Sequence, residues 1–344
     1  MDATCNGFQH LSLLSLDPSL GFELNLDKSS WNDVPKDFYS FLITSLIDYF
    51  KSELVNNKKL SADKKESYKR LKDAHLKRSI IKKSIMTIPY NIGTTQLLNY
   101  IKENFEKIEG SDWYKSKEDE NLKIFHSDFA TIGQGLREVL DYKFPKLNLL
   151  LDYLERVANV CTILQIPIIW ALPSGLVVKQ SYLEEKEIRI KPFFFNKNKF
   201  SLKVINKKEY NREKQIRAFM PNLVHSLDAA SLALLLDSYF NDSIKSIYTV
   251  HDCFAVSANN VSNLLELLKL TYIKIYSDET YLIKLDKGII DNIKNMFGES
   301  SFNDETRTIT VSDTTTSFPD INVVLGHEPK INLNKLKKSK YILN

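Results

Sequence analysis

The sequence predicts an α-rich α/β fold for these 344 residues. Apolar residues recur at helical spacing over long stretches, most clearly in 34–56 and 126–165. Short apolar runs beside turn residues, in 166–182 and 247–256, predict β-strands instead. A hydrophobic fraction of 43% with only 10 Gly and 10 Pro allows a sizeable core, suggests about two domains and excludes low-complexity chains.

Charge and cysteine content exclude few classes of protein. The net charge of +4, from 47 basic and 43 acidic residues, neither requires nor excludes a nucleic-acid partner. The three cysteines, Cys5, Cys161 and Cys253, are too far apart for a zinc pair, and they fit a reducing compartment. We expect no membrane-spanning segment, no secretory signal and no Arg-rich transit peptide.

The first half of the chain is expected to be mainly helical. Residues 34–56 place Phe, Tyr and Leu at helical spacing, and Ser61 or Asp63 is a suitable cap for the next helix. That next helix is strongly basic and is expected to run over 64–88. The acidic and polar stretch 103–121 is expected to form a surface loop with short helical pieces.

The second half is expected to combine helices with short hairpins. Helical spacing predicts helices in 126–165, Pro221–Tyr239 and Ser262–Tyr276. Strand signals follow one another along the chain: two strands around a Pro-Ser-Gly turn in 166–182, a basic and aromatic hairpin over 186–210, and a tight strand-turn-strand over 247–256. The Ser/Thr/Pro-rich stretch 311–320 is expected to be loop.

The end of the basic helix carries residues suited to binding a nucleotide. Arg78, Lys82, Met86 and Tyr90 are spaced by four, so they lie on one third of a helix surface. Two cations in line can grip a triphosphate, and a ring can stack on a sugar or base. Pro89 ends the helix and so places Tyr90 at its end or on a bend. Spacing alone favours the alternative, a solvated basic face with a core Met and Tyr.

Three further residues have both a functional and a structural interpretation. Asp252 follows His251 between two strand-like runs, where a carboxylate can hold a metal but is also a common turn residue. Asp2 stands shortly before the apolar run Phe8–Leu16, as a helix-start residue often does. His225 lies on an apolar helix, where a histidine is more often a core residue than a ligand. Taken singly, each structural interpretation is the stronger.

The order of these motifs along the chain resembles one family, the bacteriophage-type single-subunit DNA-directed RNA polymerases of phages and mitochondria. The motifs resemble the family's motif A, motif B, the segment before motif C, and motif C, which read here DATCNGFQHLS, RSIIKKSIMTIPYN, PNLVHSLDAASL and YTVHDCFAV. Two weaker signals, IPIIWALPSGL and the ending INLNKLKKSKYILN, are also similar to family segments. The residues of motif B are most similar to those in polymerases of fungal and plant mitochondrial linear plasmids.

This resemblance implies the catalytic, C-terminal part of a right-hand polymerase. An α/β palm would be interrupted by a mostly helical fingers domain, with the N-terminal domain and the thumb absent. Palm segments would be 1–33, with motif A, and 223–344, with motif C and the tail; fingers, with motif B, would be 34–222. Since nothing precedes Met1 to form the strand that carries Asp2, we expect the isolated chain not to transcribe.

By the same resemblance, two Mg²⁺ ions would bind Asp2, Asp252 and the Ala3 carbonyl and promote in-line nucleotidyl transfer. Lys82 would contact the triphosphate and act as general acid, and Arg78 would hold phosphate. Tyr90 would select ribose. The remaining residues that the resemblance implies are Met86 and His225 at the nucleotide, and Gly7, Gln9, His10 and His251 as supporting residues.

The implied partners are a DNA template, an RNA product and ribonucleoside triphosphates, with a separate N-terminal fragment as a further candidate and no membrane. The implied location is the mitochondrion, with synthesis there. Asn91 departs from the family, in which many members carry Gly after the tyrosine. Two other functions stay open: a family A-like DNA polymerase, which lacks this motif A and usually has Phe at the tyrosine position, and a non-catalytic nucleic-acid-binding remnant.

Overall fold

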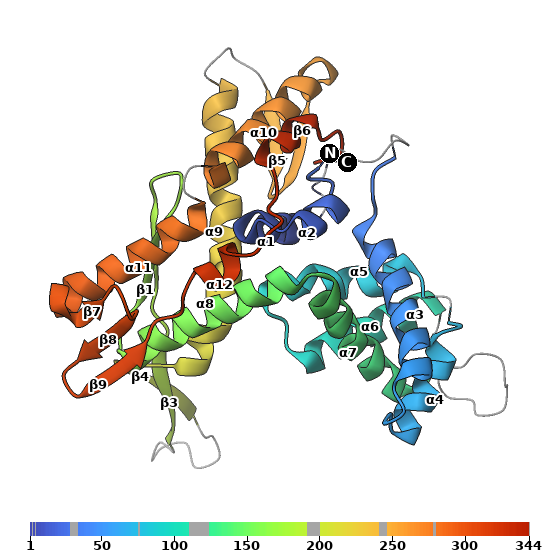
Figure 1. Cartoon of the computed structure of the whole chain (residues 1–344), viewed down its shortest axis with the longest axis horizontal. Coiled ribbons are helices and arrows are strands. Elements are labelled where there is room, and N and C mark those ends of the chain that lie inside the picture. Colours follow the sequence, from blue (N-terminus) through green and yellow to red (C-terminus); the bar gives the residue numbers. More distant parts are fainter. Residues whose placement is uncertain are drawn as a thin grey trace.

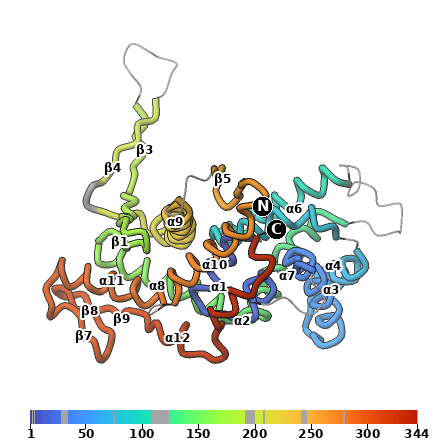
Figure 2. The backbone as a smooth tube through the Cα atoms, turned by 90° about the horizontal axis from the view of Figure 1, so that it is seen from above, coloured from blue at the N-terminus to red at the C-terminus, as the bar shows by residue number. Residues whose placement is uncertain are grey.

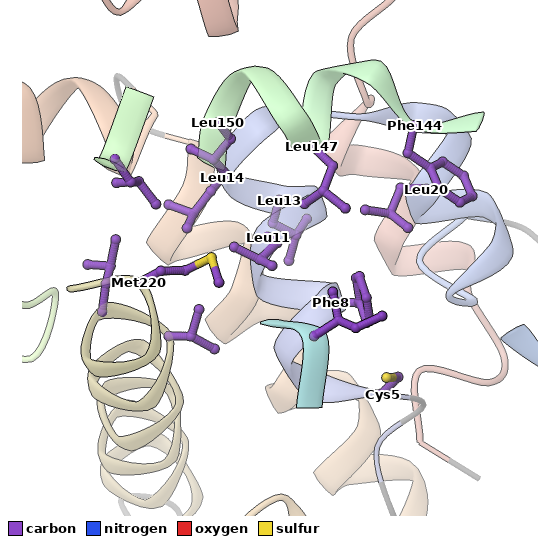
Figure 3. Packing of buried hydrophobic residues seen from close by; sticks show 14 of the residues in the cluster. Cys5, Phe8, Leu11, Leu13, Leu14, Leu20, Phe144, Leu147, Leu150 and Met220 are labelled. Carbon is purple, nitrogen blue, oxygen red and sulfur yellow. The ribbon is translucent and has the colours of Figure 1, made fainter. Parts of the chain in front are cut away.

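Helix α1 (Asn6–Ser15) lies at the centre of the molecule, and all its residues are buried (Figure 1). The computed structural model describes residues 1, 3, 5–27, 34–74, 76–109, 124–190, 200–240, 246–277 and 280–343. Figure 3 shows Phe8, Leu11 and Leu14 of α1 among side chains of α2 (Pro18–Glu23), α8 (Pro145–Ile163) and α9 (Arg212–Phe240). Both its apolar and its polar side chains are buried, so other elements enclose α1 on every side. The sequence on either side of α1 is therefore held in a fixed place.

A group of helices lies to one side of α1, at the right of Figure 1. It is built from α3 (Phe38–Asn56), α4 (Ala62–Leu71), α5 (Arg78–Thr87), the 3₁₀ turn η1 (Ile88–Tyr90), α6 (Thr94–Glu109) and α7 (His126–Lys143). Helix α3 packs against α4, α5 and α7, and α6 packs between α5 and α7. The amphipathic helix predicted over 34–56 is confirmed, and Ser61 caps α4 by accepting from the Lys64 backbone N–H.

The single basic helix predicted over 64–88 is wrong, because the chain breaks between α4 and α5. The buried positions explain the break. In α4 they are Ser67, Tyr68 and Leu71; in α5 they begin at Ile80 and Ile81. An unbroken helix would carry the first apolar stripe onto Arg78 and Lys82 instead. Breaking the helix lets both apolar faces reach the core while these cations face outward.

A second group of helices surrounds α9. It contains α8, α10 (Val261–Ser277), α11 (Tyr281–Phe297) and the short α12 (Asn322–Leu325). The helices predicted in 126–165 and from Ser262 are confirmed as α7 with α8, and α10. Helix α9 begins nine residues earlier than predicted and contains Pro221 in its interior.

Helix α9 is long and apolar enough to cross a membrane by length and composition, which the sequence reasoning did not expect. This is weak evidence, because a core helix passes the same test, and 44% of its most apolar window is buried. Helix α9 packs against α1, α8 and α10 in the folded chain.

All strand pairs that the structure describes are antiparallel. The predicted hairpins are confirmed as β1 (Ile168–Ala171) with β2 (Val177–Gln180), β3 (Leu183–Ile190) with β4 (Phe200–Tyr210), and β5 (Ile247–Val250) with β6 (Cys253–Val256). Figure 2 shows the β3–β4 hairpin projecting away from the body of the molecule. A three-stranded sheet adds β7 (Phe302–Asn303), β8 (Thr308–Val311) and β9 (Thr314–Ser317).

Two predicted loops are partly regular structure. The stretch 311–320 contains the end of β8 and all of β9, because its threonines are β-branched and fit a pleated surface. Of 103–121, residues up to Glu109 continue α6, and the rest lies outside the described residues. The overall prediction of a mostly helical α/β chain is confirmed.

Candidate active site

A pocket of about 480 Å³ lies where the start of α1, the start of α3, α5, η1 and the β5–β6 turn meet. Seven residues predicted for the site line it: Ala3, Gly7, Arg78, Lys82, Met86, Tyr90 and Asp252. Six further residues complete the lining: Cys5, Asn6, Pro35, Lys36, Asp37 and Tyr39. The structure thus brings together residues from four segments that are far apart in the sequence. Their chemical roles stay predictions.

One wall of the pocket is the basic face of α5. Arg78 donates from Nε to Asp37 Oδ2 at 2.8 Å, and its guanidinium lies 4.8 Å from the centre of the Tyr39 ring. Lys82 Nζ lies 5.8 Å from the same ring. Asp37 also caps α3 by accepting from the Tyr39 backbone N–H. The ion pair orients Arg78, and both cations of this wall lie near the Tyr39 ring.

Tyr90, at the end of η1, lines the same pocket and stacks on His225 of α9 with ring centroids 4.6 Å apart and planes 15° apart. Burial, together with the nearby charge of Asp228, raises the pKa of Tyr90 to about 12. Tyr90 therefore keeps its proton at neutral pH and can donate a hydrogen bond. His225 is exposed, so the alternative of a core histidine is wrong.

Asn91, the departure from the family pattern, has a structural reason. Its φ of 54° lies in the left-handed region that Gly and Asn tolerate best. Its Nδ2 donates to the Arg217 carbonyl at 3.4 Å. Pro221 has no N–H, so the carbonyl four residues earlier, that of Arg217, lacks its helical partner. Asn91 therefore supplies both the required backbone conformation and a link to α9.

The β5–β6 turn places Asp252 in the pocket. His251 adopts φ 53° and is exposed, while Asp252 is half-buried among the lining residues. The predicted strand-turn-strand is confirmed, since Val250 pairs with Cys253 across a two-residue turn. Such a turn presents a carboxylate at the tip of a hairpin whose base is fixed by strand pairing.

The first residues of the chain are tied on both sides. The Met1 amine donates to the Phe254 carbonyl at 3.1 Å, and the Phe254 N–H donates to the Met1 carbonyl at 2.9 Å. Ala3 forms an antiparallel bridge with Leu343. Asp2 lies outside the described residues, but the expectation that this segment is left untied is wrong. Strand pairing of Met1 with β6 brings the motif A segment beside the turn of Asp252.

Sequence similarity shows the family of the chain. A sequence model of the family described as DNA-dependent RNA polymerase matches residues 1–343. The chain belongs to this polymerase family. The match agrees with the RNA polymerase resemblance rather than with the DNA polymerase alternative.

Named relatives agree with the family. The chain is 57% identical over 350 residues to a "Probable DNA-directed RNA polymerase" of Podospora anserina, covering 100% of this chain and 37% of the relative. One of the same name from Agaricus bitorquis is 35% identical over 85% of the chain and 26% of the relative. The "DNA-directed RNA polymerase, mitochondrial" of Mus musculus is 23% identical over 80% of the chain and 21% of the relative. The chain thus spans less than half the length of these curated relatives.

The chain's donor set fits the Mg²⁺ ions that this polymerase family implies. Asp252 and Ala3 line the same pocket, and carboxylate and carbonyl oxygens are the ligands that Mg²⁺ prefers. In the part of the chain that the structure describes, no group of three or more His, Cys, Asp or Glu gathers. The ligands that the family resemblance implies are only two carboxylates, those of Asp2 and Asp252, and the carbonyl of Ala3.

The predicted supporting residues hold the polymerase's α1 in place. A Cβ on Gly7 would stand 3.0 Å from Pro89 Cβ and 3.2 Å from the Tyr90 hydroxyl, so a larger residue here would require Pro89 or Tyr90 to shift. Gln9 Nε2 donates to the carbonyls of Leu24 and Ile342, at 3.1 and 3.3 Å. Gln9 therefore holds the backbone around α1 and does not itself line the pocket.

His10 is held deep inside the polymerase and is expected to make stability depend on pH. Its Nδ1 lies 2.7 Å from the Tyr276 hydroxyl, and burial lowers its pKa from 6.5 to about 4. As the pH falls from 6.5 to about 4, His10 therefore becomes protonated in the unfolded chain while it stays neutral in the folded chain. We expect up to roughly 3 kcal/mol of unfolding free energy to be lost across this window, at about 1.4 kcal/mol per pKa unit.

Urea unfolding at pH 7, 6 and 5 measures this loss. In His10→Asn, which has no group that titrates there, the decline should be clearly smaller than in the parent. Equal declines in the two proteins would show that His10 does not cause the effect.

Five residues for which the sequence predicted no role complete the surroundings of the pocket: Asn6, Asp37, Tyr39, Asp228 and Tyr272. Asn6 Nδ2 donates to Asp228 Oδ1 at 2.6 Å, and the Tyr272 hydroxyl donates to Asn6 Oδ1 at 3.1 Å. Asp228 carries a signal that could have found it, because it follows His225 by three residues and so shares its face of α9. Asp37 and Tyr39 had no comparable signal.

Proposed function

We propose that this chain is the catalytic region of a DNA-directed RNA polymerase, which adds ribonucleotides to the 3′ end of an RNA on a DNA template. One observation carries the proposal: residues of three motifs that are far apart in the sequence, at 3–7, 78–90 and 252, line one pocket. We also propose that it works in mitochondria, as the name of the mouse relative states for that protein. The partners would be template DNA, product RNA and ribonucleoside triphosphates.

In this proposal the pocket binds the triphosphate along α5. Lys82 and Arg78 would neutralise its negative charge, and Lys82 would donate a proton to the departing pyrophosphate. Tyr90, still protonated, would donate to the ribose 2′-hydroxyl, with His225 holding its ring and touching the sugar side. Asp252 and Asp2, with the Ala3 carbonyl, would hold Mg²⁺, which when bound supplies charge stabilisation for nucleotidyl transfer.

The fold would then divide as a right hand. Residues 34–222, which include α3 to α7, would form the fingers, and 1–33 with 223–344 would form the palm. Position supports this division, because α5 and the β5–β6 turn lie in different parts of the molecule and both line the pocket. Because the chain covers 37% of the Podospora relative, the thumb and N-terminal domain would come from sequence outside these residues, in the same chain or as a separate fragment.

Primer extension tests the proposal. The chain is fused behind the N-terminal region of the 57% identical Podospora relative and given an RNA primer on a DNA template, Mg²⁺ and ribonucleotides or deoxynucleotides. We expect the fusion to prefer ribonucleotides, and the 344-residue chain alone to bind nucleic acid weakly without extension. A fusion that binds nucleic acid but never extends would favour the non-catalytic remnant.

Within that assay, Tyr90→Phe should keep extension but reduce the preference for ribonucleotides by about tenfold or more. The phenol hydroxyl is removed while the ring stack on His225 can remain, and a site built around a hydroxyl contact loses selectivity without it. The measurement is the ratio of kcat/KM for a ribonucleotide and its deoxy analogue. Tyr100→Phe, on α6 and outside the pocket, is the control. An unchanged ratio in Tyr90→Phe would remove Tyr90 from the selecting role.

A further inference from the structure

Asp228 connects helix α9 to the motif A segment through one buried amide. Asp228 is half-buried, and Asn6 is 7% exposed. Both ends of the Asn6 amide are used, Nδ2 by Asp228 at 2.6 Å and Oδ1 by the Tyr272 hydroxyl at 3.1 Å. Since a hydroxyl donates to one end and a carboxylate accepts from the other, the amide has a single favourable orientation. Its backbone is fixed with it.

The backbone that Asn6 fixes is strained and needs support. Cys5, the residue before it, adopts φ 59°, a left-handed conformation uncommon for residues other than glycine. Gly7, the residue after it, lies so close to η1 that an added Cβ would be 3.2 Å from the Tyr90 hydroxyl. A shift of the turn from Cys5 to Gly7 would therefore change the space beneath the Tyr90 hydroxyl directly.

One turn of α9 thus holds Tyr90 from two sides. His225 stacks on the face of its ring, and Asp228, on the same face of α9, holds the turn under its hydroxyl through Asn6. We propose that Asp228 is a positioning residue for sugar selection, which fixes the Cys5–Gly7 turn so that the Tyr90 hydroxyl meets a ribose and disfavours a 2′-deoxyribose. This inference rests on the proposed function of Tyr90, and it adds a carboxylate that never touches the nucleotide.

Exchanging the side chains of Asn6 and Asp228 tests whether the hydrogen bond between them, rather than either residue by itself, is what matters. Asn6→Asp faces one carboxylate with another, so the hydrogen bond becomes a repulsion. In the double variant Asn6→Asp/Asp228→Asn the bond returns with donor and acceptor exchanged, and the carboxylate now at position 6 still accepts from Tyr272. Asp228→Ala removes the bond altogether, and Asp228→Asn keeps a weaker, neutral one. Asp237→Asn, an exposed residue of the same helix, is the matched control.

Titration calorimetry in Mg²⁺ measures the affinities of the 344-residue chain for ATP and for 2′-deoxy-ATP, and the readout is the ratio of the two. The thermal unfolding midpoint of each variant is measured as well. A ratio does not change with the fraction of folded protein, so a purely structural role would leave it untouched. We expect a fall of about fivefold in Asp228→Ala and in Asn6→Asp, the size of one lost hydroxyl contact. Asp228→Asn should lie between these and the parent, and the double variant should recover.

The outcomes are distinct. A parent that prefers ATP, with an unchanged ratio in Asp228→Ala, overturns the role of Asp228 and leaves the proposed function standing. A parent that binds neither nucleotide, or both equally, removes the proposed function of the pocket and this inference with it. Should Asp228→Ala fail to fold, Asn6→Asp against the double variant decides, since no recovery of the ratio in the double variant contradicts the pairing.

Discussion

Asp252→Asn is expected to reduce RNA elongation at least about a thousandfold in the fusion that contains the missing N-terminal region. Asparagine fits the same turn, so the β5–β6 hairpin should persist, and only the negative charge is removed. A carboxylate that holds Mg²⁺ stabilises charge that develops in the transition state, and a neutral amide cannot replace it. The measurement is single-turnover extension of an RNA primer on a DNA template.

The chain contains a closely matched control for this substitution. Ser312 and Asp313 form the two-residue turn between β8 and β9, and Ser312 has φ 51° where His251 has φ 53°. Asp313 is exposed and lies outside the pocket. Asp313→Asn should elongate like the parent. Comparable losses in both variants would mean that hairpin stability rather than the charge of Asp252 limits elongation, and normal elongation by Asp252→Asn would remove it from the catalytic site.

Lys82→Gln is expected to slow nucleotide addition by about 10² to 10³, the usual effect of removing one preorganised donor from developing charge. Lys82 lies half-buried on the pocket wall, and Tyr39 and the Arg78–Asp37 pair beside it restrict its ammonium group. Glutamine keeps most of the stem and removes the charge, so stability should change little. Pre-steady-state addition of one nucleotide, at saturating substrate, measures the effect.

Lys83→Gln is the control for this change, because Lys83 is next in the sequence but faces the other way. It pairs with Glu103 at 3.4 Å and lies over the Tyr100 ring on α6. Its loss should weaken a surface contact and leave the rate of addition within about twofold of the parent. Equal slowing by the two substitutions would contradict a specific role for Lys82 and indicate a general effect of charge.

Local patterns in the sequence predicted the parts of the site that depend on local geometry. The four-residue spacing that joins Arg78, Lys82 and Met86 is a property of one helix, and the structure places all three in the pocket. The turn at His251 and Asp252 depends on two short strands and was predicted in the same way. The roles of these residues came from the family resemblance rather than from spacing.

Residues that act through tertiary contacts were missed. Asp37 reaches Arg78 across 41 positions and Asn6 reaches Asp228 across 222, distances over which no local spacing carries information. The break between α4 and α5 was missed for a similar reason. Helical spacing continues through 64–88, but packing on α3 and α7 in one half and on α6 in the other requires two different buried faces.

The tie between the two ends of the chain also bears on how the protein is made. Ala3 pairs with Leu343, and Gln9 bonds to the Ile342 carbonyl 333 positions later. Contacts so distant in sequence form slowly, because a long loop has to close before they contribute. During synthesis residues 1–9 leave the ribosome long before Ile342 and Leu343, so the motif A segment can form these contacts only after that later part of the chain has been made. A variant shortened by the last few of these residues would therefore keep most of its core and lack the contacts that hold the motif A segment in place.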